Sequence, residues 1–150
     1  MAQWNSIDQA LDFAIGEEQA AADFYTQLAN QIKLLGMKDV LMGFAQEELK
    51  HKAKLQAIKA GGSFKPTPQQ VADLRVAEYI VDVAPDPNLD YRGVLVIAMK
   101  KEKAAFKLYS DLAASATDSA VRDTFLALAQ EEAKHKLRFE VEYDDLLAEN

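Results

Sequence analysis

Residues 47–51 read E-E-L-K-H, and residues 131–135 read E-E-A-K-H. The two stretches stand 84 positions apart, and each places a glutamate three residues before a histidine. Side chains at positions i and i+3 share one face of an α-helix. Each stretch therefore predicts a helix that presents a carboxylate and an imidazole together.

The same offset of 84 relates further residues of the chain. Glu18 and Tyr25 in the first half correspond to Glu102 and Tyr109 in the second half. Each half then carries one lone glutamate and one Glu-x-x-His motif. The chain is a tandem duplication in outline.

Apolar residues recur at spacings of three and four, which is the pattern of helices with one buried face. No segment shows a convincing strand alternation, so we predict an all-α fold. The expected long helices span about residues 7–34, 37–60, 90–115 and 118–148, with a short helix over about residues 68–81.

Local signals place several of the helix ends. Ser6 and Thr67 each begin a capping-box pattern, with glutamine three residues later. Gly36 and the pair Gly61-Gly62 are expected to end the first two long helices. Asp118 or the residue before it is expected to start the last one.

The connections predict how the helices are arranged. Two of them are only a few residues long, which makes each pair of long helices an antiparallel hairpin. The connection between the hairpins has about 30 residues and holds all four prolines, Pro66, Pro68, Pro85 and Pro87. Such a link is long enough to cross the length of a bundle, so we expect a four-helix bundle of up-down-down-up order, forming a single domain over residues 1–150.

The apolar stripes of the predicted helices include acidic residues and both histidines of the chain. In the third long helix, for example, Leu95, Phe106, Tyr109 and Leu112 are predicted to point inward in register with Glu102. Burying an unpaired charge costs several kcal/mol, and the stripes supply no inward lysine or arginine. Two divalent cations would balance four carboxylates while the imidazoles stay neutral as ligands. The predicted metal ligands are Glu18, Glu48, His51, Glu102, Glu132 and His135.

Each motif has a doubled acidic residue, so Glu47 or Glu131 could also reach inward. The spacing to the histidines favours the second glutamate of each pair, which leaves Glu47 and Glu131 on the outer face or behind the ligands. Tyr25 and Tyr109 fit either as core aromatics, the favoured reading, or as hydrogen-bond donors to the ligand carboxylates.

The sequence resembles the ferritin-like superfamily, and within it the rubrerythrin family, through E-x-x-A-x-x-F-Y at Glu18, E-x-x-A-x-x-L-Y at Glu102, and the two E-E-x-x-H motifs. The resemblance implies a ferritin-like bundle, a di-iron carboxylate site held by the six residues above, and a non-haem oxidoreductase that reduces hydrogen peroxide or dioxygen, with a role in oxidative stress. Manganese or zinc are alternative metals.

Two departures from the family pattern concern the reaction. Rubrerythrins commonly have a further glutamate three residues after the first ligand of the third helix, where this chain has Ala105, and they usually carry a four-cysteine electron-transfer domain, whereas this chain has no cysteine. The six-ligand site then resembles bacterioferritin ferroxidase centres or manganese catalases. Metal binding or storage with little turnover, and a docking scaffold with a vestigial site, are the alternative functions.

Composition sets limits on partners and location. The net charge of −7 argues against nucleic-acid binding, which needs clustered lysine and arginine. No apolar run approaches the length of a membrane span, and the first residues lack the basic and apolar regions of an export signal. We expect a cytoplasmic homodimer that needs an external electron donor.

Overall fold

The computed structural model describes residues 3–33, 35–81 and 90–149. Within these ranges every regular element is helical, so the all-α prediction is confirmed. None of the described helices is long and apolar enough to cross a membrane. The helices are α1 Ile7–Gln31, α2 Leu35–Gly61, α3 Pro68–Ala72, α4 Val76–Tyr79, α5 Tyr91–Ala114 and α6 Ser119–Ala148.

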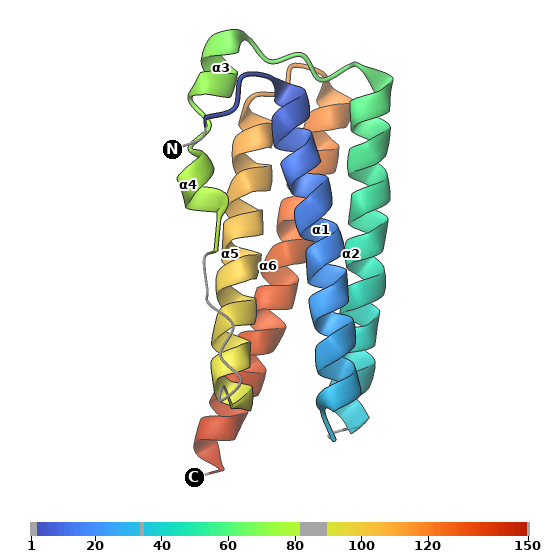
Figure 1. The fold of residues 1–150 in the computed structure, drawn as a ribbon, viewed down its shortest axis with the longest axis vertical. Coiled ribbons are helices and arrows are strands. Elements are labelled where there is room, and N and C mark those ends of the chain that lie inside the picture. Colours follow the sequence, from blue (N-terminus) through green and yellow to red (C-terminus); the bar gives the residue numbers. More distant parts are fainter. Residues whose placement is uncertain (1–2, 34, 82–89, 150) are drawn as a thin grey trace. The chain divides into compact units, whose positions relative to one another are not determined.

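The chain forms two compact units, Trp4–Val71 and Met1–Gln3 together with Ala72–Asn150, and each is described by itself. In the first unit α1 and α2 pack as an antiparallel hairpin, and in the second α5 and α6 do the same, with α4 against α5 (Figure 1). Both hairpins agree with the predicted ones. The single domain over residues 1–150 and the order of the hairpins stay predictions.

Side-chain caps fix where the helices begin. The Ser6 hydroxyl accepts the backbone N–H of Gln9 at the start of α1, and Thr67 and Gln70 cap α3 reciprocally. The carboxylates of Asp90 and Asp118 accept the backbone N–H groups of Gly93 in α5 and Val121 in α6. Such caps satisfy N–H groups that have no partner inside the helix, which is why these starts were readable from sequence.

The predicted short helix over residues 68–81 is wrong as one element, because the chain forms α3 and α4 with a break at residues 73–75. Val71, Leu74, Val76 and Tyr79 are all buried. On a continuous helix, residues two apart lie about 200° apart, so Leu74 and Val76 could not both face the core. The break lets both side chains be buried.

Three further details of the helix prediction need correction. The first helix ends at Gln31, with Ile32 extended (φ −85°, ψ 143°), and Gly36 lies inside α2. An extended end needs no left-handed residue, so no glycine stop is required there. Phe106 was predicted inward but is 42% exposed, because it lies at the margin of the buried stripe of α5. The predicted glycine break after the second long helix is confirmed, because Gly62 follows α2 with φ +68°, a conformation that glycine adopts readily.

Two parts of the prediction concern residues that the structure does not describe. Residue 34, the expected end of the first helix, and Pro85 and Pro87 of the long connection lie outside the described residues.

Candidate metal centre

One carboxylate–imidazole triad lies between α1 and α2. Its members are Glu18 on α1 and Glu48 and His51 on α2, all at most 3% exposed. The Nδ1 atom of His51 lies 3.7 Å from Oε2 of Glu18 and 3.4 Å from Oε1 of Glu48. The i, i+3 spacing on α2 places the latter two side chains on one face, and the hairpin brings Glu18 to them.

A second triad lies between α5 and α6 in the other unit. Glu102 on α5 meets Glu132 and His135 on α6, and again all three side chains are buried. The Nδ1 atom of His135 lies 3.7 Å from Oε1 of Glu102. One donor atom from each of the three residues lies within 4.8 Å of the others. The duplication seen in the sequence is thus repeated as two similar triads, one in each hairpin.

The doubled acidic residues differ in exposure. Glu48 and Glu132 are 1% exposed, whereas Glu47 and Glu131 are partly exposed. Glu131 also forms an ion pair with Lys134, Oε1 to Nζ 3.7 Å, and one of its carboxylate oxygens lies within 4.8 Å of a ring nitrogen of the buried His135. Because the Lys134 side chain is 73% exposed, this ion pair contributes little to stability.

The electrostatics of the first triad are dominated by its carboxylates. Burial lowers the pKa of His51, but the neighbouring carboxylates of Glu18 and Glu48 stabilise the protonated imidazole, outweigh burial and raise the pKa to about 9. In the metal-free protein at neutral pH the imidazole therefore carries a proton, which partly balances the two carboxylates. A metal cation would replace that proton.

Tyr25 and Tyr109 are fully buried, about two helical turns after Glu18 on α1 and Glu102 on α5. The ring of Tyr25 meets Phe44 of α2 edge-on, with centroids 6.2 Å apart. This contact fits the favoured role as a core aromatic. A hydrogen bond from either hydroxyl to a ligand carboxylate stays a prediction.

The donor chemistry of each triad fits a transition metal. Carboxylate oxygen and imidazole nitrogen are ligands that suit iron, manganese and zinc, and the burial of two carboxylates per triad provides the charge that a divalent cation needs. Di-iron and di-manganese proteins with a four-helix bundle bind their metals with one glutamate from each of two helices and one Glu-x-x-His motif from each of the other two. The residues present fit such a metal.

Comparison with known proteins now identifies the family. The model of the rubrerythrin family matches residues 9–143. The chain belongs to the rubrerythrin family. Its fold class is therefore all-α and ferritin-like, as the sequence predicts. No curated protein matches the chain.

One solved structure resembles this member of the rubrerythrin family. It is that of a hypothetical protein from Pyrococcus furiosus, with 26% sequence identity and a TM-score of 0.75. The likeness covers 95% of this chain and 91% of the other. The resemblance thus extends along nearly the whole length of both chains.

Proposed function

We propose that the two triads together hold two iron ions, and that the loaded protein reduces hydrogen peroxide or dioxygen. The observation that carries the proposal is the burial of four carboxylates and two imidazoles, gathered as two triads on a rubrerythrin-family chain. Carboxylates that were merely structural would be expected to face lysine or arginine in the core. The proposed ligands are Glu18, Glu48, His51, Glu102, Glu132 and His135.

The protein residues supply binding and charge balance. The four glutamates would neutralise two divalent cations, and each histidine would contribute a neutral ring nitrogen as a ligand. When bound, the iron pair supplies the redox chemistry, because each iron changes its charge by one electron. The burial of the triads keeps bulk water from the ligand atoms, which strengthens each electrostatic contact.

The overall reaction requires a source of electrons. Reduction of one peroxide molecule to two water molecules consumes two electrons and two protons. An external electron donor would supply them, unless Fe(II) itself is the substrate, as in a ferroxidase. A homodimeric state and a cytoplasmic location complete the proposal.

One residue favours a second candidate. Ala105 stands three positions after Glu102, where many rubrerythrins have a further glutamate. The alanine side chain has no oxygen to bind a metal, so a site here would have six protein ligands. Such a site favours a ferroxidase or a manganese-catalase type of reaction, or metal binding with little turnover.

Anaerobic reconstitution tests the proposal. The metal-free protein is titrated with Fe(II), its iron content is measured, and the loaded protein is mixed with peroxide or dioxygen in a stopped-flow spectrometer. We expect about two irons per chain and oxidation much faster than that of free Fe(II). Loaded sites that are not oxidised rapidly would exclude the redox reaction and leave metal binding. Repeating the titration with Mn(II) compares the two candidate metals.

A further inference from the structure

An open groove of about 500 Å³ lies on the second unit, between α4 with the residues after it and the outer face of α5. We call it the lysine groove. Its apolar part comes from Ile80, Val81 and Phe106, and its cationic part from Lys100, Lys103 and Lys107. Small-molecule sites commonly have this size and this mixture of an apolar lining with a few polar groups. None of the six predicted metal ligands lines it.

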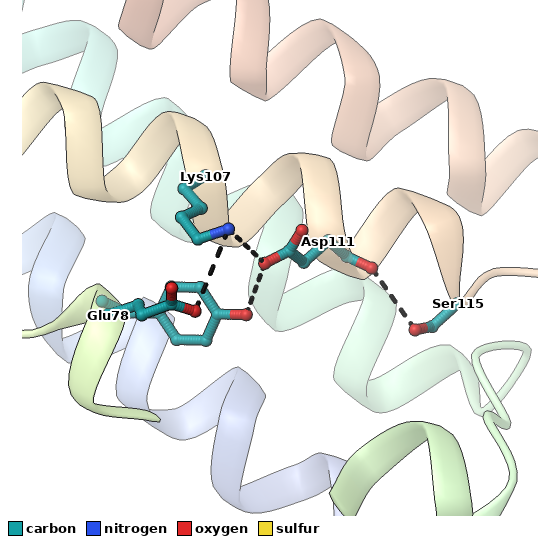
Figure 2. A network of polar contacts seen from close by, with 5 residues as sticks. Glu78, Lys107, Asp111 and Ser115 are labelled. Carbon is teal, nitrogen blue, oxygen red and sulfur yellow. Dashed lines mark hydrogen bonds and ion pairs between the residues drawn. The ribbon is translucent and has the colours of Figure 1, made fainter. Parts of the chain in front are cut away.

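A polar network holds one wall of the groove in place (Figure 2). The hydroxyl of Tyr79 donates to Oδ2 of Asp111 at 2.6 Å. The ammonium group of Lys107 lies 3.6 Å from the same oxygen and 3.9 Å from Oε2 of Glu78. Because these contacts join α4 to α5, the wall formed by α4 is positioned before any ligand binds.

The charges of the groove favour an anion. Lys107 is engaged by the carboxylates of Glu78 and Asp111. Lys100 and Lys103 are exposed and make no ion pair with the described residues. The lining therefore has a net positive charge, although the whole chain carries −7. A negatively charged group would be attracted to this part of an otherwise acidic protein.

The apolar side chains favour a ligand with a hydrophobic body. Ile80 is 50% exposed and Phe106 is 42% exposed, and both line the groove. Covering such apolar surface removes it from water and so favours binding. A ligand that combined an anionic head with an apolar chain would satisfy both parts of the lining.

The internal duplication shows that a helix can carry the lone glutamate of a triad without Lys103 and Phe106. At the offset of 84, the first half has Gln19 where the second has Lys103, and Ala22 where the second has Phe106. Gln19 instead bonds Lys52 and Asp23 within its own unit. Lys103 and Phe106 of α5, the helix that α4 packs against, thus have no cationic or aromatic counterpart at the matching positions of α1.

We propose that the lysine groove binds a small organic anion with an apolar body, such as a medium-chain carboxylate. The carboxylate lies between Lys100 and Lys103, and the hydrocarbon chain covers Ile80 and Phe106. This binding site is separate from the proposed metal centre. Its occupancy does not depend on whether the triads hold iron.

Calorimetric titration of the full, metal-free chain with decanoate, below its micelle concentration, tests the proposal. We expect one saturable site per chain that weakens as salt is added, because exposed ion pairs are screened. The double variant K100Q/K103Q should weaken binding about threefold to tenfold. Phe106→Ala, which restores the residue of the first half, should also weaken it.

Two controls separate this site from general adsorption. Lys54→Gln removes an exposed lysine of α2 and should leave decanoate binding unchanged. Decyltrimethylammonium has the same chain with the opposite charge and should bind more weakly than decanoate. Absence of saturable binding, equal binding of both surfactants, or unchanged affinity in K100Q/K103Q with an unchanged melting temperature would each overturn the proposal.

Discussion

Replacing Glu48 with glutamine should abolish most of the stabilisation that a metal gives this protein. Glu48 is 1% exposed, and its Oε1 lies 3.4 Å from Nδ1 of His51. Glutamine keeps the shape of the side chain but removes one of the two carboxylates of the first triad. A divalent cation there would lose a charged ligand and half of its local charge balance.

The size of the effect follows from binding linkage. With free Fe(II) at a hundredfold excess over its Kd, binding to the folded state adds about 2.7 kcal/mol. For a chain of this length, 1 kcal/mol moves the melting temperature by about 2–4 °C. That value applies to one iron, so a wild type loaded with two irons should melt about 11–22 °C above the metal-free protein, whereas Glu48→Gln should show less than half of that difference.

Scanning calorimetry under anaerobic conditions, with and without Fe(II), measures both differences. Glu47→Gln is the matched control, since it makes the same chemical change one residue earlier at a partly exposed position. The control should keep the full metal-dependent shift. If Glu47→Gln lost the shift and Glu48→Gln kept it, the assignment of the buried glutamate as ligand would be refuted. Equal melting temperatures of loaded and metal-free wild type would contradict a buried metal site altogether.

Three further predictions concern stability. Burial and the carboxylate of Asp111 raise the pKa of Tyr79, so the folded state holds this proton more tightly, and stability should fall as the pH rises above about 10. Tyr79→Phe should make the free energy of unfolding less dependent on pH above about 10 and should lower it by about 1 kcal/mol at pH 8. Urea denaturation at pH 8 and at a pH above 10 measures both effects. Phe125→Ala removes a fully buried ring and should lower the free energy of unfolding by about 3–5 kcal/mol. Leu137→Ala, at a 60% exposed position, should lower it by less than about 0.5 kcal/mol. The urea midpoints of the two variants measure this difference. Asp118→Ala removes the cap of α6 and should cost about 1 kcal/mol, measured in the same way.

Much of the fold was readable because its signals are local. Capping residues such as Ser6 and Asp118 satisfy N–H groups within the next turn, so a few neighbouring residues suffice to place a helix start. The 3.6-residue period likewise marked the buried faces of the long helices. The candidate metal ligands were visible because an ionisable residue within an apolar stripe is rare.

The predictions failed where burial depends on packing between segments. The break between α3 and α4 exists because Leu74 and Val76 are both buried, and the local pattern did not reveal that. Phe106 fits the period of α5, yet it lies at the margin of the buried face and lines a groove formed with residues after α4. The contact of Tyr79 with Asp111 joins residues 32 positions apart, for which the sequence carries no signal.

The sequence by itself determined the duplication, the helix starts and the six candidate ligands. Four of these lie in E-E-L-K-H and E-E-A-K-H, and the other two are Glu18 and Glu102. The tertiary structure decided the exposure of each glutamate in the two doubled pairs, how closely Glu18 and Glu102 approach the histidines of their hairpins, and the presence of the lysine groove. The physical reason is that periodicity fixes the direction of a side chain around its own helix. Its distance from other groups and its contact with water are fixed by the packing of segments that are distant in the sequence.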